Sequence, residues 1–504
     1  LDDRLAEMKA LGDVFAKGDP KVVERAVTAA QSLPLLAPCA DTVALRDPVP
    51  PPRDPISAKR VAEVREELAH IHALWVSGET TRSAHLATEL LASAEALHYA
   101  PLEAEAAFLV GNLLGDQGDF TGASRSYHHA LVAATSGRHD AVAAKAIIAL
   151  VHADGAMHSR FEDADRWAEL AEASIGRFKQ KDELLGSLYE ERSILRRRES
   201  KLGEALDDAK RALDLRLAVY GPRNDHVAIT YHFLGNAYWA LAKYPEALDA
   251  YGHATDILVA EVGPDHPKLA ATLIGMGNVH GDMGDHDRAV NDYQRALSIL
   301  ERVAPNDPDI GGIYNNMGDE LQSVGKLPEA RAQYLRALEW RNKTLGPSFE
   351  TTMVLDNLGE VSLDLDDGAA AMTYFVRARD MGEQVLGRDH ALYAGALWGI
   401  GEAYRRQGKL DLAWDAFQKS LPIAEKALGA DHPMLAKPLL LGIGLVQLAR
   451  HERASAIATL ERASRLEEQA ARPSDLAAVK AALAEATRGD TRLAKAPSSG
   501  GTHD

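Results

Sequence analysis

The chain has 504 residues, of which 46% are apolar and 26% are charged, and its formal net charge is −18. This negative balance disfavours nucleic acid and anionic membrane as main partners, because both require a basic face. One cysteine, Cys39, excludes both a disulfide within the chain and a cysteine-based zinc site. The apolar stretch 438–449 is too short to span a bilayer and is predicted to be a buried helix.

The N-terminal region is expected to differ from the rest of the chain. Residues 1–47 are predicted to form a helical segment, with two helices separated at Asp19 and Pro20. The sequence PVPPPRDP at 48–55 predicts a semi-rigid, proline-rich linker. Because the chain begins at Leu1 without the features of a signal peptide, we expect it to be part of a longer protein.

Beyond the linker, small residues recur at a nearly constant interval. The first series consists of alanines that are 41 to 43 residues apart: Ala123, Ala164, Ala205, Ala247, Ala289, Ala330, Ala371, Ala413 and Ala456. Twelve residues before each alanine stands a second, mostly glycine series: Gly111, His152, Ser193, Gly235, Gly277, Gly318, Gly359, Gly401 and Gly444. Small residues at fixed positions indicate close contacts between helices, repeated along the chain.

Each repeat is predicted to be a pair of amphipathic helices joined by a turn. The segment 234–254, LGNAYWALAKYPEALDAYGHA, has apolar residues at helical spacing on both sides of AKYP. About ten such hairpins are expected over 56–470, followed by a capping helix at 471–490 and a disordered tail at 491–504. The sequence therefore predicts an all-α fold.

Related pentapeptides separate some of the repeats: GPDHP at 263–267, GRDHA at 387–391 and GADHP at 429–433. In the first, Gly263 is predicted to end one helix, Asp265 to cap the next, and Pro267 to occupy its first turn. An alternative is that His266, His390 and His432 bind a metal ion. The histidines come from different repeats, whereas ligands must converge within about 2.0 to 2.2 Å of one ion, so a structural role is favoured.

The repeated sequence resembles the tetratricopeptide repeat (TPR). The resemblance is carried by the leucine, glycine, asparagine and tyrosine of LGNAY and by the later glutamate, alanine and tyrosine of PEALDAYGHA. The 41- or 42-residue units with their GPDHP-like connectors are similar to the repeats of kinesin light chains. This resemblance implies a right-handed α-solenoid superhelix of helical hairpins that binds a peptide or protein in its concave groove.

Residues 1–55 and the array that follows resemble a region of bacterial serine/threonine protein kinases, the one after the kinase domain and membrane anchor. The resemblance lies in the order of the segments and in their amino-acid sequence. This resemblance implies that the chain is the sensor or docking region of such a kinase, whose catalytic domain would lie upstream of Leu1. The alternative is a free-standing TPR scaffold or oligomerisation protein without a kinase.

No catalytic motif is expected in these residues. GMGNVHG at 275–281 and GIGEAY at 399–404 have the glycines of phosphate-binding loops, but both lie in predicted helices and neither follows a strand. They are interpreted as packing glycines. We therefore predict neither an enzyme nor a cofactor site in this part of the protein.

The resemblance places the ligand groove on the first helix of each hairpin, at the residue after the packing position and at neighbours four before or three after it. In the early hairpins the residue after the packing position is Asn112, Ala153 and Ile194. The candidate peptide-binding residues of the later hairpins are His232, Asn236, Trp239, Ile274, Asn278, Asn315, Asp319, Asp356, Glu360, Trp398, Glu402 and Arg405. We call these twelve the predicted groove residues.

The predicted groove residues change from neutral and aromatic to acidic along the chain. Asparagine side chains both donate and accept hydrogen bonds, so Asn236 and Asn278 suit a peptide backbone. Carboxylates at the later positions favour a protein or peptide ligand that carries basic residues. Nucleic acid and membrane insertion are not expected.

Overall fold

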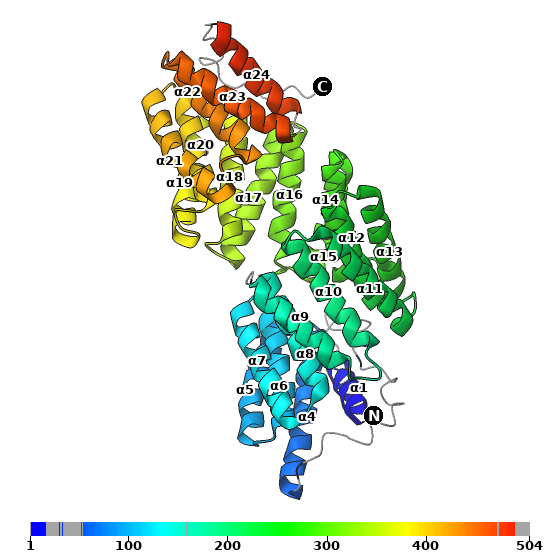
Figure 1. Ribbon diagram of the computed structural model, residues 1–504. Coiled ribbons are helices and arrows are strands. Elements are labelled where there is room, and N and C mark those ends of the chain that lie inside the picture. The colour runs from blue at the N-terminus through cyan, green and yellow to red at the C-terminus, as the bar shows by residue number, and fades with distance from the viewer. Residues whose placement is uncertain are drawn as a thin grey trace. The chain divides into compact units, whose positions relative to one another are not determined.

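The computed structural model describes residues 2–16, 30, 33, 52, 54–157, 160–470 and 473–488. All regular elements in these residues are helical, which confirms the predicted all-α fold (Figure 1). The chain divides into two compact units, residues 1–279 and 280–504. Cys39, the second predicted N-terminal helix except residues 30 and 33, most of the 48–55 linker and the 491–504 tail lie outside the described residues.

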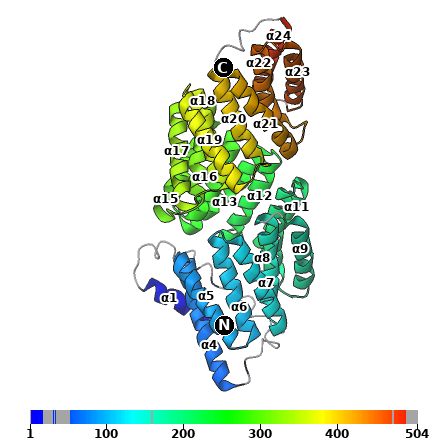
Figure 2. The same ribbon diagram turned by 90° about the vertical axis from the view of Figure 1, so that its left-hand side faces the viewer.

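The first unit consists of successive antiparallel helices. Their bounds are α1 (Asp2–Phe15), α4 (Pro55–Val76), α5 (Thr80–Ala96), α6 (Ala100–Asp116), α7 (Phe120–Gly137), α8 (Asp140–Leu150), a π-helical turn (Val151–Met157), α9 (Phe161–Ile175), α10 (Asp182–Arg198), α11 (Leu202–Tyr220), α12 (Asp225–Ala240), α13 (Tyr244–Val262) and α14 (Pro267–Asp282), whose last turn enters the second unit. Each helix packs mainly on its neighbours in sequence, and Figure 2 shows α4, α5 and α6 side by side.

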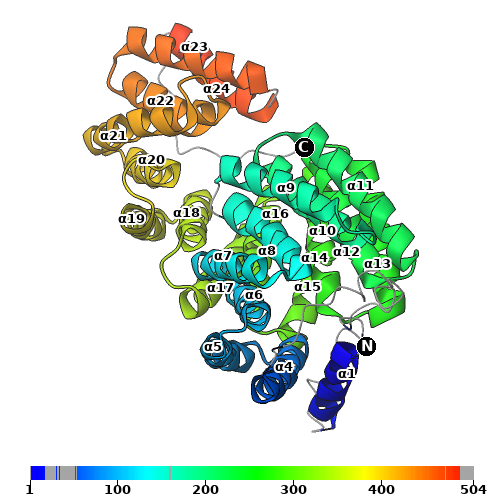
Figure 3. The same ribbon diagram turned by 60° about the horizontal axis from the view of Figure 1, so that its bottom comes forward.

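The second unit continues the same pattern. It contains α15 (His286–Val303), α16 (Asp309–Ser323), α17 (Leu327–Thr344), α18 (Phe349–Asp364), α19 (Gly368–Val385), α20 (Ala391–Arg406), α21 (Leu410–Leu428), a short 3₁₀ turn (Pro433–Leu435), a π-helical turn (Ala436–Leu440), α22 (Leu441–Ala449), α23 (Arg453–Ala470) and α24 (Pro473–Arg488). The apolar stretch 438–449 is largely buried, as predicted. Figure 3 shows α22, α23 and α24 packed together at the end of the unit.

The core is a series of small clusters between adjacent hairpins. One joins Val61 and Ile71 of α4 to Leu90 of α5 and Leu102 of α6. At the other end, α24 packs Ala482 and Ala486 on Leu448 and Leu460. The predicted packing alanines from Ala123 to Ala456 are all at most 1% exposed. Because each cluster is local, the stability of each hairpin depends chiefly on its immediate neighbours.

In most hairpins of the described chain, the turn between the two helices contains a residue in the left-handed conformation. Gly325, the first residue of GKLP at 325–328 between α16 and α17, has φ of 75°, and Pro328 follows at the start of α17. Between α12 and α13 the same place is taken by Ala242, with φ of 55°. The sequence AKYP thus makes the same turn as GKLP, although alanine adopts this conformation less readily than glycine.

The pentapeptides are helix boundaries, and in each the histidine accepts a hydrogen bond from the start of the next helix. Gly263 ends α13 with φ of 92°, as predicted. The Nδ1 atom of His390 accepts a hydrogen bond from the backbone N–H of Leu392 at 3.1 Å, and His266 and His432 make the same contact two residues ahead at 3.2 Å. At the start of α14, His266 therefore accepts from a backbone N–H of the first turn. The cap by Asp265 stays a prediction.

Replacing His390 by alanine is expected to lower the free energy of unfolding by about 0.5 to 2 kcal/mol, the usual cost of losing an N-cap acceptor. His390→Asn should retain most of the stability, because its side-chain oxygen accepts from the same N–H, as Asn224 does for His226 at 2.9 Å. Urea unfolding of the two variants would test this. Equal losses in both would show that ring packing, including the contact with Phe349, is what matters.

Candidate functional site

An aromatic ring packed between two glycines fixes the position of the predicted groove residues. A Cβ atom added to Gly235 of α12 would lie 2.5 Å from the ring of fully buried Tyr251, and one added to Gly275 of α14 would lie 2.7 Å from the same ring. Such distances leave no room for a side chain. The prediction that the GMGNVHG glycine is a packing residue inside a helix is thereby confirmed for Gly275.

The same tyrosine holds the residue that follows the packing glycine. The Tyr251 hydroxyl donates to Oδ1 of Asn236 at 2.7 Å, and Tyr127 donates to Asn112 at 3.0 Å. Asn236 therefore has a structural role in addition to any contact with a ligand, which was not predicted. The sequence signal for it is an asparagine followed by a tyrosine fifteen residues later.

In the first unit, Asn236 also contacts a histidine on its own helix. Nδ2 of Asn236 lies 3.0 Å from Nε2 of His232, and burial lowers the pKa of His232 to about 4. The Nδ1 atom of His232 is buried and has no hydrogen-bond partner among the described residues. Trp239, Ile274 and Asn278 are half-buried on α12 and α14. The predicted groove residues of this unit thus form a partly buried polar and aromatic face.

Arg197 was not among the predicted groove residues, although it belongs with them. It stands three residues after Ile194 on α10, the position that Trp239 occupies relative to Asn236. Its side chain is half-buried, and burial lowers its pKa. The periodic spacing is the signal that would have found it.

In the second unit, a hydrogen-bonded network joins α16, α17 and α18. Asn315 donates to Oδ2 of Asp319 at 3.1 Å, and its own Oδ1 accepts from Asn357 at 3.0 Å. The Tyr334 hydroxyl donates to Oδ1 of Asp319 at 2.6 Å, and Gln322 accepts from the same hydroxyl at 2.9 Å. These contacts hold Asn315 and Asp319 together, so two neighbouring predicted groove residues form one rigid cluster.

Two further predicted groove residues of this unit have polar atoms without partners. Oδ1 of Asp356 on α18 and Nε1 of Trp398 on α20 are buried and make no hydrogen bond within the part of the chain that the structure describes. Asp356 lies against α20, since a Cβ atom added to Gly395 would be 3.4 Å from its Oδ2. Burial raises the pKa of Asp356 to about 7 and that of Asp319 to about 6. Glu360 is half-buried on the same helix as Asp356.

The raised pKa of Asp356 predicts a pH-dependent stability. The folded state retains a proton that the unfolded chain loses near its ordinary pKa of 3.8, so stability falls as the pH rises from about 4 to about 7. Asp356→Asn removes this effect. Because Asp356 keeps some contact with solvent, the variant should be more stable than the wild type by about 1 to 2 kcal/mol at about pH 8, and by less at about pH 4.5.

Thermal or urea unfolding at both pH values would measure this difference. Asp415→Asn is a matched control, because Asp415 is 72% exposed and pairs only with Lys419 at 3.7 Å. A gain from Asp356→Asn that is the same at both pH values would contradict the titration of Asp356.

The last two predicted groove residues are already paired within the chain. Glu402 accepts two hydrogen bonds from Arg405, both at 2.7 Å, and one from Arg406 at 3.0 Å. Burial opposes ionisation of Glu402, but these arginines outweigh it and hold its pKa below the usual range. The carboxylate predicted to face a basic ligand is therefore neutralised by its own helix.

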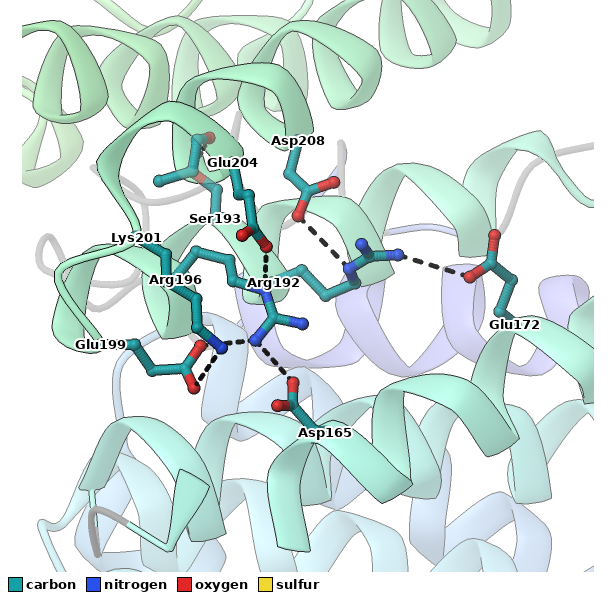
Figure 4. Close-up of polar contacts among 10 residues, drawn as sticks. Asp165, Glu172, Arg192, Ser193, Arg196, Glu199, Lys201, Glu204 and Asp208 are labelled. Carbon is teal, nitrogen blue, oxygen red and sulfur yellow. Dashed lines mark hydrogen bonds and ion pairs between the residues drawn. The ribbon is translucent and has the colours of Figure 1, made fainter. Parts of the chain in front are cut away.

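Two early hairpins lack the packing glycine, and each compensates differently. Ser193 on α10 donates to the carbonyl of Ala205 at 2.8 Å. On the same helix, Arg192 forms a salt bridge with Asp208 and Arg196 forms one with Asp165 (Figure 4). At His152 the helix widens into the π-helical turn. Nδ1 of His152 lies 2.8 Å from Oε2 of Glu191, and the charge of Glu191 raises the pKa of His152. These sites are structural variations of the repeat.

None of the described helices has the length and apolar character needed to cross a membrane. Among the described residues, no group of three or more histidine, cysteine or acidic side chains is arranged to hold a metal ion. His266, His390 and His432 use their Nδ1 atoms to cap helices instead.

Antiparallel helix pairs with small residues at each crossing define a helical-repeat protein. Two family models, each described as Tetratricopeptide repeat, match residues 184–258, 257–302, 348–426 and 393–469, and residues 311–349. Together they cover more than half of the chain, which therefore belongs to the tetratricopeptide repeat family. No curated protein matched the sequence.

Several solved structures are similar to this chain. The "putative kinesin light chain nearly identical TPR-like repeats" of Podosopora anserina is 14% identical, with 39% of this chain and 93% of that chain covered and a TM-score of 0.35. A Rap protein complexed with competence and sporulation factor is 17% identical, with 70% and 98% covered and a TM-score of 0.43. The APC/C hetero-tetramer Cut9–Hcn1 is 14% identical, with 84% and 90% covered and a TM-score of 0.39.

Proposed function

We propose that this chain is a protein-interaction module that binds a peptide or protein segment along the first helices of its hairpins. The observation that carries this proposal is the set of partnerless polar atoms among the predicted groove residues. Nδ1 of His232, Oδ1 of Asp356 and Nε1 of Trp398 are buried without hydrogen bonds. Buried polar groups are nearly always paired, so a ligand that supplies the missing partners explains them.

The second unit favours a ligand with basic residues. Asp319 and Asp356 have raised pKa values because burial is not balanced by a cation. A lysine or arginine side chain beside them would restore their ionised forms. The indole N–H of Trp398 would at the same time donate to a backbone carbonyl of the ligand. Glu402 contributes less, because Arg405 and Arg406 already neutralise it.

An array of short synthetic peptides, graded from basic to acidic composition, would test this function. Wild type should retain peptides in which lysine or arginine follows an apolar segment, and Asp319→Asn/Asp356→Asn should lose them. Asp415→Asn, at an exposed position on α21, is the control. If both variants retain the same peptides as the wild type, the binding surface lies elsewhere.

We also propose that the module is the sensor or docking region of a bacterial serine/threonine protein kinase with 41- or 42-residue, kinesin-light-chain-like repeats. The resemblance of residues 1–55 and of the GPDHP-like connectors supports this context. The test is the coding sequence upstream of Leu1, which should contain a glycine-rich loop, a strand lysine and a catalytic aspartate. An upstream sequence without these motifs would favour the free-standing scaffold. Analytical sedimentation would then measure whether that scaffold associates with itself.

A further inference from the structure

The hairpin formed by α10 and α11 lacks the aromatic ring that fills the junction between the two helices in most other hairpins. In the α12–α13 hairpin this ring is Tyr251, whereas the equivalent residue of α11 is the fully buried Ala209. The packing glycine of the first helix is also absent, because Ser193 takes its place. A methyl group instead of a buried ring makes far fewer contacts, so this junction has less apolar packing than its neighbour.

Charged side chains occupy positions of this junction that are apolar elsewhere. In the register of the repeat, Arg192 corresponds to Leu234 of α12, and Asp208 corresponds to Ala250 of α13. Leu234 and Ala250 are buried in one apolar cluster. Buried apolar residues take the position of Arg192 in other hairpins as well: Val110, Val151, Met317, Leu358, Ile400 and Ile443.

The ion pairs that replace this apolar packing have poor geometry. Nε of Arg192 lies 3.3 Å from Oδ2 of Asp208, and Nε of Arg196 lies 3.2 Å from Oε2 of Glu204 (Figure 4). Both Nε atoms and Oδ2 of Asp208 are buried, yet none of these three atoms makes a hydrogen bond with a described residue. Burial also outweighs the nearby arginines and raises the pKa of Asp208. The pairs therefore do not fully compensate for the removal of these charges from water.

Further contacts between α10 and α11 are polar too. Arg216, at the position of the buried Leu258 in the next hairpin, donates to both carboxylate oxygens of Glu190 at 3.1 and 2.7 Å. Ser193 donates to the carbonyl of Ala205 at 2.8 Å. Buried ion pairs are often no more stabilising than apolar residues of similar volume. Because the stability of an array is a sum over its junctions, local unfolding begins where a junction contributes least.

We propose that the α10–α11 hairpin is the place where the repeat array of the first unit opens by local unfolding, while α6–α7 and α12–α13 stay folded. This inference goes beyond the proposed function, because it describes a motion of the array and needs no ligand. Glu190 has the register position of His232 and accepts from Thr230 of α12 at 2.5 Å. Opening separates Glu190 from Thr230, which interrupts the row of first helices that carries the predicted groove residues.

Native-state hydrogen exchange of the full chain in low urea, measured by mass spectrometry of proteolytic fragments, tests this proposal. Protected amides of α10 and α11 should exchange about tenfold to a hundredfold faster than those of α6, α7, α12 and α13. Such a factor corresponds to the burial of one apolar side chain. Equal protection of the three hairpins in the wild type would overturn the proposal without any variant.

A double variant identifies the cause. Arg192→Leu/Asp208→Ala gives the α10–α11 hairpin the residues that α12–α13 has at these positions, and should slow exchange in α10 and α11 by about tenfold or more. Arg166→Leu/Asp163→Ala makes the same two changes in an exposed pair on α9 and should change exchange by less than about threefold. Unchanged or faster exchange of α10 and α11 in the first variant would overturn the proposal, because the ion pairs would then not weaken the junction.

Discussion

Replacing Phe417 by alanine is expected to lower the free energy of unfolding by about 3 to 5 kcal/mol, the usual cost of removing a buried aromatic side chain. Phe417 on α21 is fully buried. Its ring is packed between Gly401 of α20 and Gly442 of α22, where added Cβ atoms would lie 2.6 and 2.9 Å away. Because helix backbones hold both glycines, the cavity cannot close without moving a helix, so little of the loss is recovered.

Urea unfolding followed by far-ultraviolet circular dichroism measures this effect. Leu412→Ala is the matched control, because Leu412 lies on the same helix and is 49% exposed. Its loss should stay within about 1 kcal/mol. Similar losses for the two variants would contradict the packing of Phe417 between glycines.

The repeat architecture could be predicted because it depends on residue size. An alanine or glycine is required wherever two helix axes approach closely, and such residues recur at a visible interval. The ring that fills the space was missed, because Tyr251 and Gly235 are separated by sixteen residues and a turn. Once that spacing is known, Phe375 and Phe417 can be placed opposite Gly359 and Gly401 by sequence alone.

The predicted groove residues were chosen by position, and position does not decide whether a side chain is available to a ligand. Glu402 is bound by Arg405 three residues later, but Asp356 has no cation nearby. Similarly, Arg196 and Arg197 are adjacent in sequence, yet among the described residues Arg196 alone of the two forms ion pairs. Ion pairing between helices depends on side-chain direction in three dimensions, which periodicity alone does not give.

Glu402→Gln is expected to lower the free energy of unfolding by about 3 to 5 kcal/mol, because it leaves buried arginine charge without a carboxylate. Glu402 and Arg405 are 7% and 6% exposed, so water cannot replace the lost partner. Glutamine has nearly the same shape as glutamate, so the loss of stability would come from the missing charge and not from altered packing.

Urea unfolding of three variants would establish that cause. Glu383→Gln breaks an exposed pair with Arg388 on the neighbouring part of the chain, and should cost no more than about 1 kcal/mol. The double variant Glu402→Met/Arg405→Met removes both buried charges and should recover most of the stability lost in Glu402→Gln, since apolar residues can replace a buried ion pair. If the double variant is as unstable as Glu402→Gln, the loss comes from the hydrogen bonds and packing of Arg405 itself. The shape of the predicted groove would then depend on the placement of Arg405, and ligand binding in the second unit should fall in both variants.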